Sequence, residues 1–329
     1  MVFIKNKREN MMNDYITGYC RSHPDVVKIN GLPLIVQKSQ NPNLVPIISG
    51  GGSGHEPAHL GFVGKGMLSA AIYGEIFTPP TADEILESIR TIHNGQGVFI
   101  IVKNFEADLL SFRQAITSAR EEGIDVRYII SHDDISVDTK HNFRMRHRGL
   151  AGTILLHKIL GAAALSGNDL DSLEQLALSL APEIATIGFA TSSAHLPDTK
   201  TPLFDLKEGE ISFGIGIHGE EGYRTVTFSS SEQLANEIVN KLNLKFHWKE
   251  GDEYILLVNN LGSMSELEQG IFLNDLCQFL ELEGLKLVYI KTGQLMTSLD
   301  MSGISVTLCH LKNPLWLEYL KQPTSAPAW

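Results

Sequence analysis

Short apolar runs typical of buried β-strands alternate with amphipathic stretches typical of α-helices along most of this chain. Strands are predicted at Val45–Ser49, Gly97–Val102 and Val126–Ile130, and helices at Thr81–Ile92 and Asp108–Glu121. The first helix begins with the Thr-x-x-Glu spacing of a capping box. Because parallel strands are usually joined through a helix, this alternation predicts α/β layers wound in parallel.

The second half of the chain repeats the pattern. After two further predicted helices, Gly149–Leu165 and Asp169–Leu180, a polar, proline-containing stretch at Thr191–Gly209 marks a crossing into a second unit. Strands are then predicted at Ile211–Ile217, Tyr254–Val258, Leu287–Ile290 and Ser305–Leu308, and helices at Ser231–Leu242 and Ser265–Leu282. We therefore expect two α/β domains, residues 1–190 and 191–329, with largely parallel or mixed sheets covered by helices.

The charge balance limits the classes of partner. Lys and Arg number 27 against 38 Asp and Glu, so the formal net charge is −11. A protein that neutralises phosphates needs a basic surface, so direct nucleic-acid binding is not expected and a role at DNA would need a basic partner. Three cysteines without Cys-x-x-Cys spacing and the lack of a long apolar run favour a reducing, cytoplasmic location.

Two glycine-rich stretches each place one histidine in a tight loop after a β-branched run. His55 lies in the stretch at residues 49–57 and His218 in the stretch at residues 214–220. Glycine lets backbone N–H groups approach a small polar ligand, and imidazole supplies an acid, a base or a nucleophile near neutral pH. The two stretches are therefore the first candidates for a functional site.

A third candidate follows the predicted strand Gly97–Val102, where Lys103 and Asp108 lie at its carboxyl end. α/β folds bind their ligands at this end of the strands. Asp108 can act as the N-cap of the next helix or as a carboxylate that reaches the ligand, and the two roles are compatible. With His55 on the neighbouring loop, the topology makes an acid/base pair plausible.

Other motifs favour ordinary structural roles. Gly214-x-Gly216-x-x-Gly219 matches the dinucleotide fingerprint, but two glutamates and a glycine follow it where that fold needs a helix. No phosphate-loop pattern is present, and we expect no cofactor and no metal. For His132-Asp133-Asp134 a solvated loop is favoured over a metal site, and for Arg144-x-Arg146-His147-Arg148 a solvated turn is at least as probable as an anion site.

Several motifs occur in the same order as in one known family, and they span nearly the whole chain. They are Ser-Gly-Gly-Gly-Ser-Gly-His-Glu-Pro at 49–57, Gly-Glu-Ile-Phe-Thr at 74–78, Lys103-Asn104 with Asp108, Gly-Ile-Gly-Ile-His-Gly-Glu at 214–220, Asn-Asn-Leu-Gly at 259–262 and Thr-Ser-Leu-Asp-Met-Ser-Gly at 297–303. Together they resemble the dihydroxyacetone-binding DhaK subunits of dihydroxyacetone kinases.

The resemblance implies a homodimer of two-domain α/β subunits without a cofactor of its own, with the phosphoryl donor on a separate subunit. It implies that His218 adds to the ketone as a covalent hemiaminal, which selects ketones over glycerol. It also implies that the positions holding the triose hydroxyls, with His55 and Asp108 as acid/base partners, are Gly52, Ser53, Gly54, His55, Lys103 and Asp108.

The chain also departs from the kinase pattern beside these positions. Kinase subunits usually have Asn-Tyr-Thr-Gly-Asp at 104–108, His-Gly-Glu-Pro-Gly at 218–222 and Gly-Arg-Arg-Gly at 146–149, whereas Glu106 and Glu221 add negative charge here. The pattern resembles a subgroup that senses dihydroxyacetone and coactivates a TetR-type transcription factor (DhaS-like). The alternative is a dihydroxyacetone-binding subunit of a phosphotransferase-dependent kinase with neutral loop changes, and an enzyme with other carbonyl chemistry is less favoured.

Overall fold

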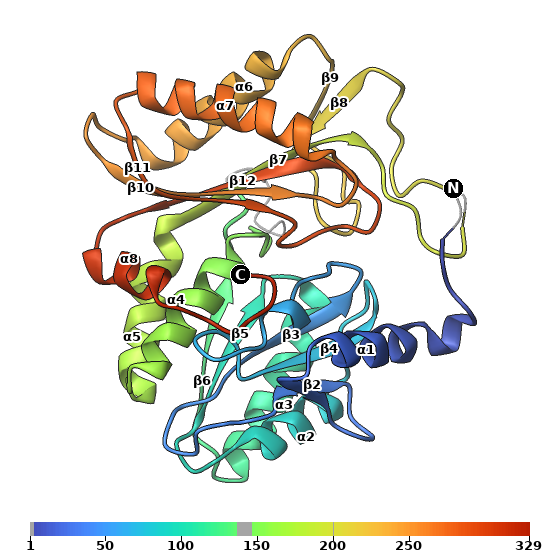
Figure 1. The fold of residues 1–329 in the computed structure, drawn as a ribbon, viewed down its shortest axis with the longest axis vertical. Coiled ribbons are helices and arrows are strands. Elements are labelled where there is room, and N and C mark those ends of the chain that lie inside the picture. The colour runs from blue at the N-terminus through green and yellow to red at the C-terminus, as the bar shows by residue number, and fades with distance from the viewer. Residues whose placement is uncertain (1–2, 137–146, 200) are drawn as a thin grey trace. The chain divides into compact units, whose positions relative to one another are not determined.

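The computed structural model describes residues 3–136, 147–199 and 201–329, which divide into two compact units (Figure 1). Unit 1 comprises Met1–Ser131, Leu155–Ser179 and Glu318–Trp329, and unit 2 comprises His132–Ile154 and Leu180–Leu317. The sequence predicts a single crossing near residue 190, whereas the chain passes between the units more than once. The predicted α/β class with mixed sheets is confirmed.

Unit 1 contains a six-stranded sheet in the order β1-β2-β4-β3-β5-β6. Its strands are β1 (Val26–Lys28), β2 (Leu34–Gln37), β3 (Ile47–Ser53), β4 (Ala70–Ile76), β5 (Val98–Lys103) and β6 (Val126–Ser131). The last four pair in parallel, as the alternating pattern predicts, and β1 and β2 add an antiparallel edge. The carboxyl ends of β3 and β5 therefore meet at one edge of the sheet.

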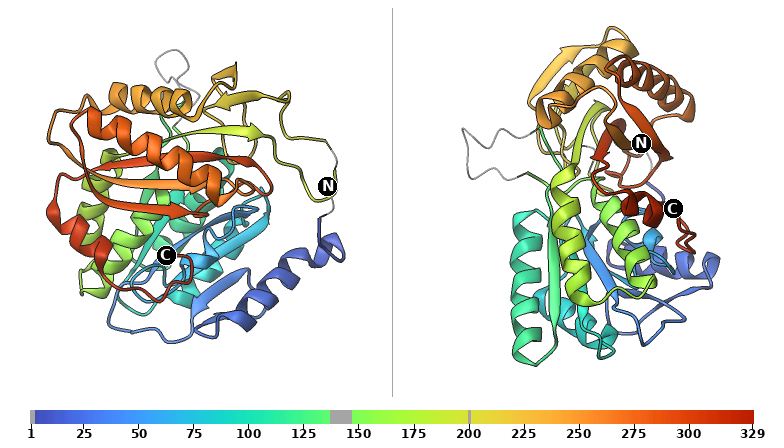
Figure 2. Two further views of the ribbon diagram at one scale, coloured as in Figure 1. Left: turned by 45° about the horizontal axis from the view of Figure 1, so that its top comes forward. Right: turned by 90° about the vertical axis from the view of Figure 1, so that its left-hand side faces the viewer.

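Helices cover both faces of this sheet. They are α1 (Met11–Ser22), α2 (Ala82–Ile92), α3 (Glu106–Glu121), α4 (Thr153–Leu165) and α5 (Leu170–Leu180), with 3₁₀ turns at Arg8–Asn10 and Leu60–Phe62. A third 3₁₀ turn, Ala181–Glu183, belongs to unit 2. The right-hand view of Figure 2 shows α3, in teal, on one side of the strands and α4, in light green, on the other. Both hydrogen bonds of the capping box between Thr81 and Glu84 are formed, which confirms the predicted start of α2.

Unit 2 contains a second six-stranded sheet, in the order β11-β10-β12-β7-β8-β9. Its elements are β7 (Ile184–Ser192), β8 (Glu210–Phe213), β9 (Arg224–Thr227), α6 (Ser231–Phe246), β10 (Glu253–Asn260), α7 (Glu266–Leu282), β11 (Lys286–Gly293) and β12 (Ser302–His310), and α8 (Pro314–Lys321) follows. Among these strands β10 and β11 pair in parallel and the other neighbours are antiparallel. α6 and α7 bury their apolar faces against the sheet.

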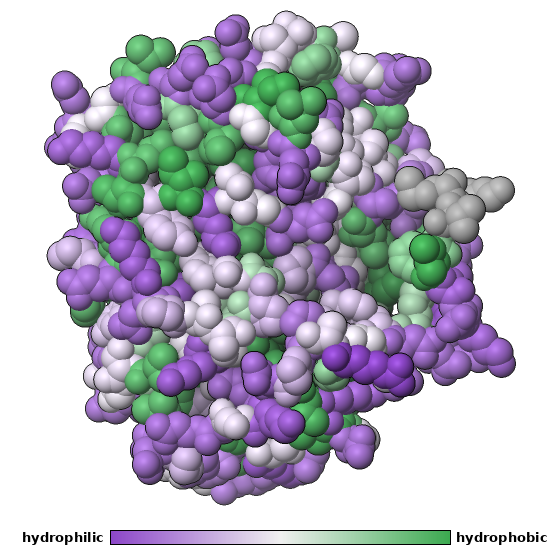
Figure 3. Space-filling view, in the orientation of Figure 1, coloured by the Kyte–Doolittle hydropathy of each residue, from purple (hydrophilic) through white to green (hydrophobic). Residues whose placement is uncertain are grey.

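The outer side of α7 carries exposed apolar residues among polar ones. Leu267 is 75% exposed and Leu282 is 82% exposed. Figure 3 shows apolar side chains, in green, in the part of the view where α7 lies in Figure 1. Within the described residues, none of the helices combines the length and apolarity needed to cross a membrane.

The prediction of a solvated loop at His132-Asp133-Asp134 is wrong, because both carboxylates are buried. Asp133 accepts hydrogen bonds from the backbone N–H groups of Leu150 and Gly152, at 2.8 and 2.9 Å. Asp134 forms an ion pair with Arg148, whose Nε lies 2.6 Å from its Oδ2. Partners distant in the sequence thus compensate the cost of burying both charges.

Candidate ligand-binding residues

The first glycine stretch lies within β3 rather than after it. The predicted strand ends at Ser49, but pairing continues to Ser53 because glycines let the neighbouring backbone come close. A Cβ at Gly50 would lie 2.3 Å from the carbonyl oxygen of Ile72, and one at Gly52 would lie 2.7 Å from the backbone nitrogen of Thr78. Larger residues at either position would therefore push the β3 backbone away from these neighbours.

Lys103 and Asp108 both lie against this glycine stretch. A Cβ at Gly51 would be 2.8 Å from Nζ of Lys103 and 2.8 Å from Oδ1 of Asp108. Both side chains are buried, with exposed fractions of 0% and 4%. The carboxyl ends of β3 and β5 therefore bring these two groups to one place in unit 1.

Asp108 is not the N-cap of α3. The helix begins at Glu106 and its N-cap is Phe105, which makes no side-chain capping bond. Asp108 lies in the first turn instead, where the N–H groups and the dipole of the helix favour a carboxylate. Of the two roles compared in the sequence, that of a carboxylate at the strand end is the one this position supports.

His55 is fully buried in the turn that follows β3. Its ring stacks on Phe77, with ring centroids 5.1 Å apart and an angle of 23° between the planes. A Cβ at Gly54 would lie 2.8 Å from the Phe77 ring, so the glycine makes room for the aromatic partner. The backbone N–H of Gly54 donates to both carboxylate oxygens of Glu56 at 3.1 Å, and burial raises the pKa of that carboxyl group.

Two more buried histidines in unit 1 lie close together. The rings of His59 and His157 have centroids 5.1 Å apart, and Nε2 of His59 and both ring nitrogens of His157 find no hydrogen-bond partner in the described part of the chain. Burial and then the charge of Lys103 lower the pKa of His157 to about 3. His157 is therefore neutral at physiological pH, in keeping with the structural role expected for it.

The second glycine stretch, in unit 2, pairs its histidine with a carboxylate. Nδ1 of His218 lies 3.2 Å from Oε1 of Glu220, and the backbone N–H of His218 donates to Oε2 at 3.0 Å. Burial raises the pKa of Glu220, but the hydrogen bond and charge of His218 and the charge of Arg148 lower it to about 2. An ionised carboxylate only accepts hydrogen bonds. In the neutral form of the His218 ring, Nδ1 therefore carries the proton and Nε2 keeps its lone pair.

Gly216 makes this arrangement possible. A Cβ there would lie 1.9 Å from Oε2 of Glu220 and 2.3 Å from Nη1 of Arg148. Arg148 is itself held by Asp134 and by the carbonyl oxygen of Gly214, to which its Nη2 donates at 2.8 Å. Arg148 therefore belongs to a network of paired charges, while Arg144 and Arg146 of the same predicted cluster lie outside the described residues.

The dinucleotide interpretation of the second glycine stretch has no structural support. The next regular element after Gly219 is the strand β9, which begins at Arg224, and no helix N-terminus follows the glycines directly. Among the residues described, no group of three or more His, Cys, Asp and Glu side chains is arranged to hold a metal ion.

Sequence reasoning missed the groups that support the histidines. Glu220 and Phe77 were noticed only as members of motifs, because which side chains touch depends on the fold. In unit 2 it also missed a pair formed by His195 and Asp300, whose Nδ1 and Oδ2 atoms lie 2.9 Å apart. These two residues are 105 positions apart, and no local pattern connects them.

Known proteins with similar sequences cover almost the entire chain. The Dak1 domain model matches residues 17–328. The chain is 54% identical over 326 residues to the DhaKLM operon coactivator DhaQ of Lactococcus lactis subsp. lactis (strain IL1403), covering 98% of this chain and 99% of the relative. It is 41% identical over 327 residues to the dihydroxyacetone-binding subunit DhaK of the PTS-dependent dihydroxyacetone kinase of the same organism, covering 99% and 98%.

A solved structure agrees with these relatives. The dihydroxyacetone kinase operon co-activator Dha-DhaQ matches with a TM-score of 0.93 and 54% sequence identity, over 96% of this chain and 97% of that chain. Both sheets described above therefore belong to a fold that is already known.

Proposed function

The chain belongs to the Dak1 domain family, and on that basis we propose that it is a dihydroxyacetone-binding sensor and a coactivator of the dihydroxyacetone kinase operon. One observation carries the proposal. The chain shares 54% of its residues with the coactivator DhaQ of Lactococcus lactis but 41% with the kinase subunit DhaK of the same organism, over nearly the same length. This difference favours the regulatory branch of the family.

His218 is the residue that we propose to bond with the ligand. Its Nε2 lone pair adds to the carbonyl carbon of dihydroxyacetone, the carbonyl oxygen gains a proton, and the imidazole releases the proton held at Nδ1. Glu220 favours this step because it holds the proton on Nδ1 beforehand and stabilises positive charge as the new C–N bond forms. Glycerol has no carbonyl carbon and forms no such bond.

Six positions of unit 1 are proposed to bind hydroxyl groups of the triose. The backbone of Gly52, Ser53 and Gly54 offers polar groups in a stretch without bulky side chains, and Lys103 offers a buried ammonium group. His55 and Asp108 complete the set as acid/base or orienting partners. Their burial supports this role, since charge-assisted hydrogen bonds are stronger away from water.

The proposed protein partner is a TetR-type transcription factor (DhaS-like) in the cytoplasm, and the proposed oligomer is a homodimer. With a net charge of −11 the chain does not suit DNA itself, so the partner has to supply the basic surface. Sedimentation of the purified protein should give twice the mass of one chain. A monomer at micromolar concentration would contradict the homodimer.

The second candidate function is a subunit of a phosphotransferase-dependent dihydroxyacetone kinase, which the 41% identity to DhaK favours. The test mixes the protein with the kinase's nucleotide-binding subunit, a phosphoryl donor and dihydroxyacetone. We expect no phosphorylated triose, because the exposed Glu106 and Glu221 repel an incoming phosphoryl group. The DhaK subunit in the same mixture is the positive control, and turnover at a comparable rate by this chain would favour the kinase.

A further inference from the structure

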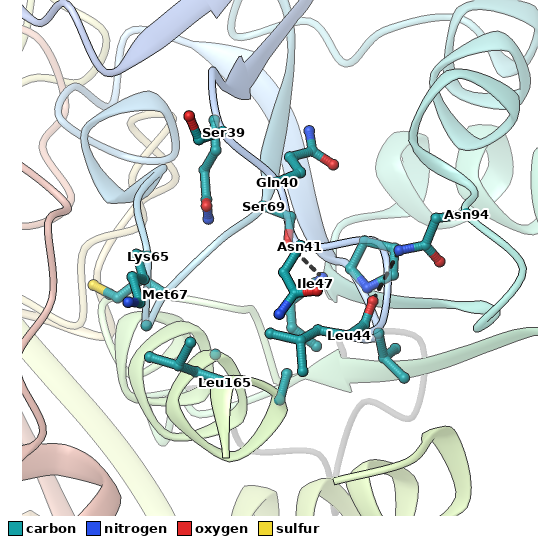
Figure 4. A pocket seen from close by; sticks show the side chains of 16 residues that line it. Ser39, Gln40, Asn41, Leu44, Ile47, Lys65, Met67, Ser69, Asn94 and Leu165 are labelled. Carbon is teal, nitrogen blue, oxygen red and sulfur yellow. Dashed lines mark hydrogen bonds between the residues drawn. The ribbon is translucent and has the colours of Figure 1, made fainter. Parts of the chain in front are cut away.

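Unit 1 contains a pocket at the edge of its sheet where the parallel strands begin. It encloses about 410 Å³, within the range of small-molecule sites. The segments before β3 and β4 and the last turn of α4 line it, as Figure 4 shows. β3 begins here at Ile47 and ends at Ser53 in the first glycine stretch, so the pocket and that stretch lie at opposite ends of one strand.

Hydrogen bonds hold the pocket wall in place. The side-chain amide of Gln37 donates to the carbonyl oxygen of Leu68 at 2.7 Å, and that of Asn94 donates to the carbonyl oxygen of Leu44 at 2.9 Å. The backbone N–H of Ile47 donates to the hydroxyl of Ser69 at 3.1 Å. These polar side chains maintain the shape of the pocket through hydrogen bonds within the protein.

Close contacts with α4 and with the C-terminal segment hold the other part of the pocket wall in place. A Cβ at Gly161 of α4 would lie 2.4 Å from Cα of Met67, so this helix packs directly on the backbone of the pocket wall. Lys65 is anchored by the C-terminal segment, because its backbone N–H donates to the hydroxyl of Ser325 at 2.9 Å and its carbonyl oxygen accepts from the backbone N–H of Ser325 at 3.1 Å. The pocket is therefore preformed, which lowers the entropic cost of binding.

Three polar side chains at the rim remain available for a ligand. Within the described part of the chain, neither the ammonium group of Lys65 nor the side chains of Ser39 and Gln40 have a hydrogen-bond or ion-pair partner. Figure 4 shows Ser39 and Gln40 in the upper part of the view and Lys65 at its left, beside Met67.

The charge and the apolar part of the lining define the ligand class. Among the described residues that line the pocket there is no aspartate or glutamate, although the chain carries 38 acidic residues, and Lys65 is their only charged side chain. Apolar surface comes from Leu44, Val45, Pro46 and Leu165. The lining thus combines one cation, hydrogen-bonding groups and a short apolar wall.

We propose that this pocket binds a small organic anion, a compound with one phosphate or carboxylate group for Lys65, a hydroxyl group for Ser39 or Gln40, and a short carbon skeleton. The phosphate and carboxylate classes share the chemistry that Lys65 recognises. This site is distinct from the glycine stretches and does not depend on the proposed function.

The test measures binding of two probes, glycerol 3-phosphate and 3-hydroxybutyrate, with uncharged glycerol as the reference. Two-dimensional ¹H–¹⁵N NMR of the full chain should show saturable shifts of the Gln40 and Asn41 side-chain amides with at least one charged probe and none with glycerol. The probe that binds identifies the class as phosphate or carboxylate. Shifts that are absent with both charged probes, or equal with glycerol, would overturn the proposal.

Variants of the lining residues test whether the charge of Lys65 binds the anionic probe. Lys65→Gln should weaken binding of the active probe about tenfold or more, because it removes a charge-assisted hydrogen bond while leaving the backbone contacts with Ser325 in place. Lys7→Gln changes an exposed lysine of the same unit that does not line the pocket, and should bind like the unaltered protein. Gln40→Ala gives a second, milder loss. Unchanged affinity in Lys65→Gln would refute the site.

Discussion

Nδ1 of His218 and Oε1 of Glu220 are 3.2 Å apart, and in the proposed adduct Nε2 is therefore the ring nitrogen that bonds with the ketone. The glycine-rich stretch after a β-branched run and the family motif both predict His218 as a candidate. They do not predict the function of Glu220, two positions away, since the contact exists only when the loop folds back over Gly216. A candidate residue can thus be predicted from local pattern, whereas the side chain that contacts it cannot.

His157 provides a prediction about stability and pH. Its pKa is about 3 in the folded protein and near 6.5 when exposed, so between these values the unfolded chain binds a proton that the folded chain does not. Stability is therefore fully present above pH 6.5 and falls as the pH decreases toward 3, by up to about 1.4 kcal/mol per pH unit for this residue. Urea unfolding at about pH 7, 6 and 5 should show the loss.

The variant His157→Leu should reduce the slope of the unfolding free energy against pH by the contribution of one proton. The contribution of His59 should remain. Phe62→Leu is the matched control, because Phe62 is buried and packs near the same ring but does not titrate. It should lower stability at every pH without changing the slope. If His157→Leu keeps the full slope of the unaltered protein, the imidazole of His157 is not the group that resists protonation.

At the scale of elements, the sequence was most accurate where a local signal marks a boundary. Thr81 and Ser265 each form both bonds of a capping box, and α2 and α7 begin directly after them. The sequence predicts that β3 ends at Ser49, before the glycine stretch, but it pairs with β4 up to Ser53. The prediction of a solvated loop at Asp133 and Asp134 fails because the groups that hydrogen-bond to these carboxylates come from more distant segments of the chain.

Gly216→Ala tests whether the close approach of Glu220 over Gly216 is needed for His218 to bind the ketone. The new Cβ would overlap Oε2 of Glu220, so the carboxylate should move away from His218. With dihydroxyacetone labelled with carbon-13 at its carbonyl, the unaltered protein should show the signal of a tetrahedral carbon. We expect that signal to be strongly reduced in Gly216→Ala and absent in His218→Ala.

Gly270→Ala provides the control for this experiment. Gly270 lies within α7 with open space around its Cβ position, so alanine there should leave the adduct unchanged. A tetrahedral signal that persists in His218→Ala would show that another residue forms the bond. A signal of normal intensity in Gly216→Ala would show that Glu220 is not needed in its present position.

At the scale of the whole molecule, the α/β class could be predicted from alternation but the path of the chain could not. The predicted domains, 1–190 and 191–329, assume that neighbours in sequence stay together. The C-terminal residues Glu318–Trp329 nevertheless belong to unit 1, where they hold Lys65 through Ser325. Composition gives the net charge of −11, which disfavours direct binding to DNA, but it does not show which surface a protein partner would contact.

We propose that dihydroxyacetone occupancy makes this protein a coactivator. The direct measurement is an electrophoretic mobility shift of operator DNA that carries a TetR-type regulator. It detects binding of this protein to the regulator with and without dihydroxyacetone. Linkage requires that a ligand which promotes the complex is itself bound more tightly within it. We predict a complex that forms with dihydroxyacetone, not with glycerol, and is lost in His218→Ala. A complex that forms equally without ligand, or none under any condition, would contradict the account.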